Sequence, residues 1–378
     1  MAGNPQTEQV DTVVIGGGQA GLAVGYYLAR RRRPFVILEA ADRVGNSWRN
    51  RWEGLRLFTS ARYDGLPGMP FPAPGHDLPT KDEVADYLAA YAAMADLPVR
   101  TGVSVDRLVR ADSNNSWLIH AGFLRIAASQ VVVATGAYHR QKVPAFAADL
   151  DPGITQLHAM DYRSASQLRE GPVLVVGASN SGAEIAMSAA RGHQTLLSGR
   201  DTGKMPVRPE SRMARLFDPP FWFFINRVVR TDTAIGRKAR SSIVDHGGPL
   251  ERIWPTDLAA AGVERVYAKV RGVRDGQPLL DDGRVVEVAN VIWCTGFRPD
   301  FEWIEPSIVG SDGWPIHVRG VVTGAPGLYV VGLPFLYSAA SALLGGVGRD
   351  AGYIVGQIVA RREPSPARSG HTSAVVPG

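Results

Sequence analysis

Cysteine is nearly absent from this chain, since Cys294 is the only one in 378 residues. A single thiol excludes an internal disulfide framework and a Cys-x-x-Cys redox pair. Long apolar runs are also missing: no stretch approaches the roughly 18 residues of a transmembrane helix, and residues 1–12 lack the apolar core of a signal peptide. We therefore predict a cytoplasmic protein with no integral membrane segment.

Concentrated charge is the second feature that the chain lacks. The net charge of +5 comes from 41 basic and 36 acidic residues, and the arginines are scattered except for Arg30 to Arg33. That run falls in the last turn of a predicted helix, where cations interact favourably with the helix dipole. The sequence therefore predicts no nucleic-acid partner. It also contains no Ser-His-Asp arrangement and no metal-ligand cluster, so we predict no metal site.

What the chain does contain is a dinucleotide-binding βαβ pattern over residues 13–40. A buried apolar strand runs into GGGQAG, which is Gly-x-Gly-x-x-Gly at a strand end. Its three glycines permit a tight turn, the approach of a pyrophosphate, and close packing of a helix predicted over about residues 21–32. A second strand, residues 35–38, ends in an acid that suits the ribose hydroxyls. The predicted nucleotide contacts are Gly16, Gly18, Gln19, Ala20, Gly21 and Glu39.

Residues 40–80 are rich in glycine and proline and are predicted to form loops near that nucleotide. Arg43, Ser47 and Trp48 follow the ribose-binding acid and are predicted cofactor contacts. The alternative for Trp48, as for Trp52, is that it only fills the edge of the core. Residues 59–74 are predicted to wrap a cavity. A further buried strand over residues 131–136 brings two more predicted contacts, Thr135 and Gly136.

A second pattern of the same kind occupies residues 171–200. A strand over 173–176 leads into GASNSG, a helix over 183–190 and a strand over 195–197. Ser179 stands where the second glycine of the motif normally lies, and it is small enough for a phosphate to approach. No acid ends the second strand; Arg200 follows instead, and it is either a partner for the 2′-phosphate of NADP or a solvated surface charge. The predicted contacts are Gly177, Ser179, Asn180, Ser181, Gly182, Ser198 and Arg200.

The remaining elements are predicted from turn residues and hydrophobic periodicity. Thr80 and Glu83 form a capping box at the start of an amphipathic helix. Cys294 is predicted to be a small buried residue. The other predicted elements are an antiparallel meander over 103–126, β-hairpin structure over 263–291, a strand over 291–293 that returns the chain to the first domain, a last strand over 328–331, a helix over about 341–362, and a disordered tail from 363.

Residues 201–262 show no dinucleotide-binding pattern. They contain the basic segment KMPVRPESR and, at residues 216–225, the aromatic segment LFDPPFWFFI. This run is too short and too interrupted by proline to span a membrane. Three alternatives stay open: a lid over the active site, a dimer contact, or a patch that touches a membrane surface.

Two dinucleotide sites in one chain indicate two cofactors that exchange electrons, and in this respect the sequence resembles the flavin-containing monooxygenases. The likeness, to single-component bacterial members and to plant auxin-forming members, covers residues 10–361. The matching segments are GGGQAG, RVGNSWR, ATG at 134–136, GASNSG, VIWCTGFRPD at 291–300 and PGLYVVGLPF at 326–335.

Two departures from the family pattern concern its reaction. The family sequence F-x-G-x-x-x-H-x-x-x-Y/F is half present, because His158 and Tyr162 keep their spacing while Pro152 and Ile154 replace the Phe and the Gly. A final Tyr rather than Trp makes the resemblance closer to N- or S-oxygenating enzymes than to Baeyer-Villiger enzymes. Ser60 stands where eukaryotic-type members carry an Asn that contacts the oxygenated flavin. The resemblance thus makes Ser60 the predicted catalytic residue; the alternative is an ordinary loop residue.

The resemblance also implies the cofactors and the chemistry. FAD would bind the first motif, with Thr295 and Gly332 joining its site, and NADPH the second. The loop after Gly332 leads to a helix whose N-terminal amides would face the flavin's pyrimidine carbonyl. NADPH would reduce FAD, O2 would add at flavin C4a, and the resulting hydroperoxide would oxygenate a small nucleophilic substrate.

The predicted fold class is α/β, with two nested Rossmann-like domains and the NADPH domain inserted in the FAD domain. The predicted boundaries are 1–160 and 289–362 for the FAD domain and 161–288 for the NADPH domain, which includes the aromatic insertion at about 201–262. A homodimer is one arrangement compatible with this layout. The open functional alternatives are an NAD(P)H-dependent reductase or oxidase, Baeyer-Villiger oxidation of ketones, and a non-catalytic redox sensor.

Overall fold

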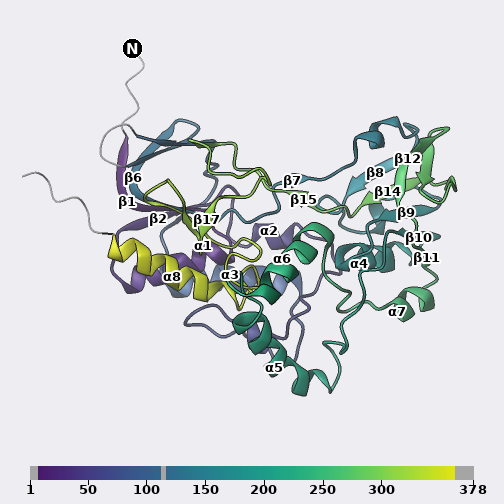
Figure 1. Ribbon diagram of the computed structural model, residues 1–378, viewed down its shortest axis with the longest axis horizontal. Coiled ribbons are helices and arrows are strands. Elements are labelled where there is room, and N and C mark those ends of the chain that lie inside the picture. Colours follow the sequence, from purple (N-terminus) through teal and green to yellow (C-terminus); the bar gives the residue numbers. More distant parts are fainter. Residues whose placement is uncertain (1–6, 112–115, 362–378) are drawn as a thin grey trace, which may run out of the picture.

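The predicted βαβ unit forms the centre of the first of two lobes (Figure 1). A computed structural model describes residues 7–111 and 116–361 of the chain. In it, β1 (Glu8–Ile15), α1 (Gln19–Arg30) and β2 (Phe35–Leu38) follow one another, and β1 pairs in parallel with β2 and with β6 (Leu124–Val133). Val14 packs into one hydrophobic cluster while Val13 and Ile15 pack into another. The strand is therefore buried on both faces, which explains its uninterrupted apolar sequence.

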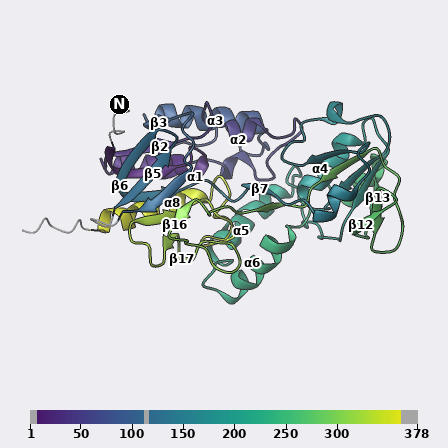
Figure 2. The same ribbon diagram turned by 90° about the horizontal axis from the view of Figure 1, so that it is seen from above.

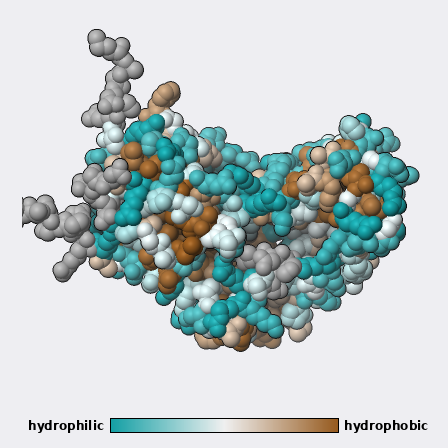
Figure 3. Space-filling view, turned by 45° about the horizontal axis from the view of Figure 1, so that its top comes forward, coloured by the Kyte–Doolittle hydropathy of each residue, from teal (hydrophilic) through white to brown (hydrophobic). Residues whose placement is uncertain are grey.

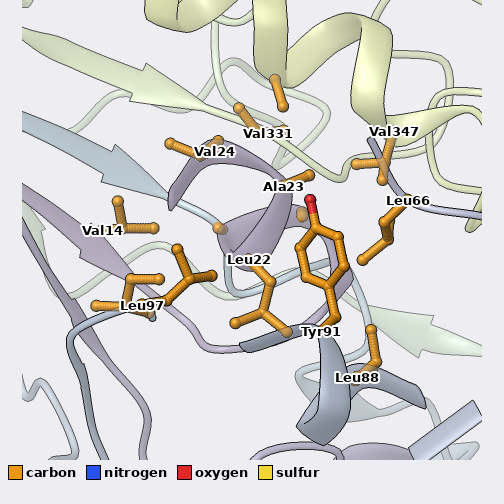
Figure 4. Packing of buried hydrophobic residues seen from close by; sticks show 14 of the residues in the cluster. Val14, Leu22, Ala23, Val24, Leu66, Leu88, Tyr91, Leu97, Val331 and Val347 are labelled. Atoms are coloured by element: carbon orange, nitrogen blue, oxygen red, sulfur yellow. The ribbon is translucent and has the colours of Figure 1, made fainter. Parts of the chain in front are cut away.

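Helices α1, α3 (Lys81–Met94) and α8 (Val347–Ala360) supply most of the first of these clusters. Figure 4 shows Tyr91 and Leu88 of α3 packed beside Leu22 of α1. The predicted capping box is confirmed, since Thr80 Oγ1 accepts a hydrogen bond from the N–H of Glu83 at 3.2 Å, and the Thr80 N–H donates to the Glu83 carboxylate at 2.7 Å.

Three predicted helix starts were wrong. α4 (Asn180–Ala189) begins three residues earlier than predicted, because Ser179 is its N-cap. α1 begins at Gln19, two residues earlier than predicted, because Gly18 is its N-cap. α8 begins at Val347 and not near Ser341. The Ser341 hydroxyl accepts hydrogen bonds from the N–H groups of Tyr337 and Ser338, and this holds the preceding residues in turns rather than in a helix. The tail from Glu363 lies outside the described residues.

Strand β6 takes part in two kinds of pairing. Its first half continues the predicted meander, pairing antiparallel with β5 (Trp117–Ala121), which pairs in turn with β4 (Arg107–Arg110). Its other edge pairs in parallel with β1 from Ile126 to Val133, and its last three residues also pair in parallel with β19 (Leu328–Val330). Residues 131–133 are thus the end of a long strand and not a separate one. The sheet is completed by β3 (Val99–Arg100), β16 (Ile304–Glu305), β17 (His317–Val318) and β18 (Val321–Val322).

The second lobe contains a five-stranded parallel sheet with the order β11-β10-β9-β14-β8. The predicted unit is present as β9 (Val173–Val176), α4 (Asn180–Ala189) and β10 (Thr195–Ser198). The predicted hairpin is also present, with Asp275 and Gly276 at positive φ between its strands. The other elements here are β8 (Thr155–His158), β11 (Glu264–Val266), β12 (Val270–Arg274), β13 (Gln277–Leu280), β14 (Asn290–Trp293) and α7 (Pro255–Ala260).

One predicted strand belongs to the other lobe. Residues 291–293 do not return the chain to the first domain, because β14 pairs with β8 and β9 inside the second sheet. A fully apolar strand suits the middle of either sheet equally well, so its sequence did not distinguish between them. The domain boundaries at 160 and 289 are still proposals, and this pairing favours moving them to the neck between the lobes.

That neck is a two-stranded antiparallel ribbon, β7 (Arg140–Gln141) with β15 (Phe297–Arg298). Figures 1 and 2 show β7 lying between the two lobes. The surface is hollowed between the lobes along the upper margin of Figure 3. The short elements are α2 (Asn46–Arg49), η1 (Ala61–Tyr63), η2 (Ala145–Asp149) and η3 (Ala165–Gln167).

The aromatic segment forms a helix, α5 (Ala214–Arg227), which is followed by α6 (Ala234–His246). Proline does not break it: Pro219 and Pro220 both lie within α5. The carbonyls that lose a hydrogen-bond partner are those of Arg215 and Leu216, and both residues are exposed, so water can satisfy them. Within the described residues, no helix has both the length and the apolar character needed to cross a membrane.

Candidate functional site

A cavity of about 340 Å³ opens at the carboxyl ends of β1, β2 and β6. This edge is where open parallel sheets bind nucleotides. Five predicted residues contribute to its walls, namely Gly16, Gly18, Glu39, Ser47 and Thr135. Among the other lining residues, those with polar or aromatic side chains are Ser104, His139, Asp300 and Trp303, which were not predicted as site residues. Arg43 is exposed and is not among the residues that line this cavity.

The three motif glycines differ in what surrounds them. A Cβ on Gly16 would lie 2.6 Å from the Ala134 carbonyl oxygen, and one on Gly21 would lie 1.9 Å from the Gly16 oxygen. These two glycines are required by the packing of the protein itself. A Cβ on Gly18 would meet no protein atom within 4 Å, and its φ of −79° suits any residue. Gly18 therefore leaves open space at the N-terminus of α1, which fits a pyrophosphate.

Glu39 occupies the position expected of a ribose-binding acid. Its carboxylate accepts hydrogen bonds from the N–H of Gly17 at 2.6 Å and from the N–H of Ala41 at 2.9 Å. These contacts fix the side chain at the cavity wall. A carboxylate has about four acceptor sites, so it retains the capacity to accept two ribose hydroxyls.

Thr135 is held by a histidine that sequence reasoning missed. His139 Nδ1 accepts from the backbone N–H of Asp300 at 2.9 Å, so the ring proton is assigned to Nε2, which lies 3.1 Å from Thr135 Oγ1. Burial lowers the pKa of His139 and favours this neutral form. With His139 donating to it, the Thr135 hydroxyl is left to donate its own proton into the cavity. Gly136, beside it, has a left-handed φ of 80° at the strand end.

The start of α1 is tied to two other segments of the site. The Gln19 side chain donates to the Ala342 carbonyl at 2.9 Å and accepts from the Trp48 indole at 3.2 Å. A Cβ on Gly332 would lie 2.7 Å from the Cβ of buried Ala20, so the Gly332 loop lies directly against this helix. The predicted residues Gln19, Ala20, Trp48 and Gly332 are therefore neighbours. Trp48 also packs against the core, as the alternative interpretation held, and its contact with a cofactor stays a prediction.

The second nucleotide-binding turn is built in the same way. A Cβ on Gly177 would lie 2.3 Å from the Cys294 oxygen, and one on Gly182 would lie 1.7 Å from the Gly177 oxygen. The polar side chains of the turn bind another segment of the protein: Ser179 donates to the Gly248 carbonyl at 2.9 Å, and Asn180 donates to the Pro249 carbonyl at 3.0 Å. Contact of this turn with a phosphate would therefore come from backbone N–H groups. Ser181 is half-buried on the first turn of α4.

Arg200 follows β10 at the carboxyl end of the second sheet, as predicted. The loop that carries it is held by Arg265 of β11, whose guanidinium donates to the carbonyls of Gly199 at 2.7 Å and Arg200 at 2.9 Å. Ser198 is fully buried and donates to the Ala268 carbonyl at 2.7 Å, so its hydroxyl supports the strand end. Arg265 was missed because a charged residue in a short strand gives no sequence signal of this role.

The partly retained family motif lies at the neck. His158 Nδ1 accepts from the Met160 N–H at 3.1 Å, and its Nε2 lies 3.0 Å from the Gly296 carbonyl oxygen; burial lowers its pKa. Tyr162 is buried and donates to Ser188 at 2.9 Å. Thr295 donates to the Lys142 carbonyl and so joins the two crossings of the neck. These contacts give His158 and Thr295 structural roles at the neck, whereas Tyr162 is fixed within the second lobe by Ser188 of α4.

Trp52 connects the lobes on another side. It is buried in the core cluster of the second lobe, and its indole donates to Glu184 of α4 at 3.1 Å. The Arg252 guanidinium lies 3.0 Å from the same carboxylate. Burial raises the pKa of Glu184 to about 7 despite this cation. Trp52 thus fills a core, as the alternative interpretation held, but the core belongs to the other lobe.

Ser60 is buried and bonded to the aromatic insertion. Its hydroxyl donates to Asp218 of α5 at 2.6 Å, and the ring of Tyr63 stacks on Trp222 of α5 at 5.1 Å. A serine has one hydroxyl proton, so while this bond exists Ser60 donates to Asp218 and to no ligand. The catalytic role of Ser60 stays a prediction. What these contacts do establish is that α5 is anchored on the first lobe.

Asp64, four residues after Ser60, is buried and only half satisfied. One of its carboxylate oxygens accepts from Thr59 at 2.6 Å, and the other has no partner; burial raises its pKa from 3.8 to about 7. Because the folded-state pKa is raised, the cost of ionising Asp64 grows as the pH rises from 3.8 to 7 and is complete above 7.

We expect Asp64→Asn, which mimics the protonated acid, to stabilise the fold at about pH 8.5 by on the order of 3 kcal/mol and to change it little near pH 4. Urea unfolding at the two pH values measures this difference. A matched Asp106→Asn variant, on an exposed side chain, should lack the pH-dependent gain. An equal effect of Asp64→Asn at both pH values would mean that its carboxyl group does not titrate in this range.

Two Gly-rich turns, each at the carboxyl end of a parallel sheet and the start of a helix, define a class of oxidoreductase that binds two nucleotides. The family model for pyridine nucleotide-disulphide oxidoreductase matches residues 13–231. An uncharacterized CzcO-like oxidoreductase of Geobacillus kaustophilus is 37% identical over 93% of this chain and 98% of its own length.

Two monooxygenases extend this comparison. A probable indole-3-pyruvate monooxygenase of Arabidopsis thaliana, YUCCA3, is 30% identical over 85% of this chain and 81% of its own length. The structure of a flavin-containing monooxygenase from Stenotrophomonas maltophilia superimposes with a TM-score of 0.76 at 27% identity, covering 94% of this chain and 99% of that one. The chain belongs to the flavin monooxygenase family. This finding confirms the resemblance inferred from the sequence motifs.

Proposed function

We propose that the protein is an FAD- and NADPH-dependent monooxygenase that uses O2, through a C4a-(hydro)peroxyflavin, to oxygenate a small N- or S-containing substrate. The observation that carries this proposal is the pair of nucleotide-binding turns on two joined lobes. The first turn has open space in front of Gly18, and in the second lobe Arg200 follows the strand that comes after the second turn. Monooxygenase relatives that align along most of the chain support the reaction class.

The residues of each turn would hold one cofactor. Backbone N–H groups after Gly18 would bind the FAD pyrophosphate, Glu39 its ribose, and the Thr135 hydroxyl would donate to an acceptor in the cavity. Arg200, on the loop that Arg265 supports, would pair with the 2′-phosphate of NADPH. When bound, the two cofactors supply the hydride transfer and the activation of O2. Helix α5, anchored through Ser60 and Tyr63, would cover this site against water.

The reductase alternative receives no support from the cysteine. Cys294 is half-buried rather than fully buried as predicted, and desolvation still raises the pKa of its thiol to about 12, so it stays protonated and unreactive at neutral pH. A reductase of this chain would need an external acceptor such as a quinone. We propose a cytoplasmic enzyme that acts on a small molecule and has no nucleic-acid partner. Analytical sedimentation of the purified protein measures whether it forms a dimer.

The proposal is tested by the balance of NADPH and product. We expect the yellow protein to oxidise NADPH in air and to convert methyl phenyl sulfide or a tertiary amine to its oxide, with close to one product per NADPH. Product analysis measures the oxygen that is incorporated into the substrate, and a peroxide assay measures the oxygen that is released as H2O2. A full equivalent of H2O2 with no oxidised sulfide, amine or ketone would overturn the monooxygenase assignment. Oxidation of cyclohexanone alone would indicate Baeyer-Villiger chemistry.

A further inference from the structure

Helix α5 has two faces of opposite character. At 100° per residue, its inner face carries Asp218 and Trp222, which contact Ser60 and Tyr63 of the first lobe. The inner face also includes Asn226, whose carbonyl accepts from Arg349 of α8 at 2.8 Å. The helix is therefore fixed on this side, and the exposure of its other side does not result from loose packing.

The outer face presents large apolar side chains to solvent. Met213 is 67% exposed, Leu216 82% and Phe223 64%, and at 100° per residue they lie within an arc of about 80°. We call this set the α5 outer face; it comprises Met213, Leu216, Pro219, Pro220, Phe223 and Phe224, all exposed. Figure 1 places α5 at the lower edge of the molecule. Isolated exposed apolar residues need no explanation, but a contiguous helix face of them indicates a partner.

The charges around the α5 outer face are mostly positive, and the exposed acids nearest to it in the chain, Glu210 and Asp232, are paired with Arg252 and Arg230. Arg212, Arg215 and Arg227 are exposed at its rim, whereas Asp218, the acid within α5, points inward to Ser60. The neighbouring helix α6 adds exposed Ile235, Arg237 and Lys238. A two-fold contact with a second copy would bring arginines against arginines, which disfavours a dimer through this face.

We propose that the α5 outer face docks the enzyme on a bilayer surface that contains anionic phospholipids. An amphipathic helix that lies in the headgroup region has this arrangement, with phenylalanine and leucine in the middle of one face and arginines at its rim. The apolar side chains enter the boundary between headgroups and acyl chains, and the arginines pair with lipid phosphates. The carbonyls left without a partner by Pro219 and Pro220 stay in the hydrated headgroup layer. The interaction is peripheral and adds no membrane-spanning segment.

The test is sedimentation of the flavin-loaded enzyme with vesicles. We expect binding to vesicles of phosphatidylcholine mixed with phosphatidylglycerol, much weaker binding to phosphatidylcholine alone, and loss of binding as salt increases. Leu216→Glu with Phe223→Glu should weaken binding at least about tenfold, because each carboxylate would enter an apolar, anionic layer. Arg212→Gln with Arg215→Gln should remove most of the preference for the anionic lipid.

A matched control is Phe123→Glu, since Phe123 is 98% exposed on the turn between β5 and β6, far along the chain from α5. It should bind vesicles like the wild type. The α5 variants should keep bound flavin and NADPH oxidation, so failure of this proposal is distinguishable from failure of the proposed function. Equal binding by wild type and the Leu216/Phe223 variant would overturn it. So would a dimer that this variant abolishes in the absence of any vesicle binding.

Discussion

Replacing Gly18 by valine is expected to give a folded but colourless protein. The backbone at Gly18 is in an extended conformation that valine adopts readily, and a Cβ there would meet no protein atom within 4 Å. Folding should therefore survive the change. A branched side chain would instead fill the space in front of the α1 N-terminus, at a cost of at least about 1–3 kcal/mol, or roughly 5- to 150-fold in FAD affinity.

Flavin absorbance per chain measures the effect, and circular dichroism and the melting temperature show whether the fold is kept. Gly192→Val is the matched control, because a Cβ on Gly192 also meets nothing within 4 Å but lies at the end of α4 away from both turns. Gly21→Val should fail differently, by loss of folding, since its Cβ would collide with the Gly16 carbonyl. If the Gly18→Val protein is yellow and has the wild-type flavin content, the assignment of FAD to the first turn is wrong.

Arg200→Ala should raise the Michaelis constant for NADPH at least about tenfold and leave that for NADH nearly unchanged. The loss of one charge-assisted contact to the 2′-phosphate costs on the order of 1.5–3 kcal/mol, and NADH lacks that group. The dissociation constants of 2′-AMP, which carries the 2′-phosphate, and of 5′-AMP, which lacks it, give the same comparison between wild type and variant without turnover.

Arg191→Ala is the control, because Arg191 is exposed just after the C-terminus of α4, whereas the nucleotide-binding turn lies at the N-terminus of this helix. Equal losses for both coenzymes would mean that Arg200 only maintains the loop. Arg265→Met separates these roles further. It removes the hydrogen bonds that hold the Gly199 and Arg200 carbonyls but leaves the Arg200 charge in place, so it should weaken both coenzymes.

The nucleotide-binding turns could be predicted from sequence because their determinants are local. Gly21 is fixed by a collision with Gly16 in the same turn, and the two βαβ units follow from short apolar runs and helix periodicity. The capping box at Thr80 is local as well. The family resemblance then led to the prediction of FAD and NADPH as the cofactors of these turns.

What could not be predicted depends on pairs that are distant in the chain. His139 meets Asp300, Trp52 meets Glu184, and Ser60 meets Asp218, each across more than 100 residues. Neither member of such a pair carries a local signal. The prediction that β14 belongs to the first domain was wrong for a related reason, because the sequence of an apolar strand does not specify which of two parallel sheets contains it.

The first lobe is completed by β19 and α8, which come late in the chain, and this has a consequence for synthesis. β19 pairs with β6, and α8 supplies Val347, Ala351 and Ile354 to the same core as α1. A nascent chain therefore emerges from the ribosome with the N-terminal half of this core uncovered until residues near 360 are free. The second lobe, whose sheet is complete by β14, can fold first. Truncations upstream of α8 should accumulate as chaperone-bound or aggregated chains rather than as a smaller folded protein.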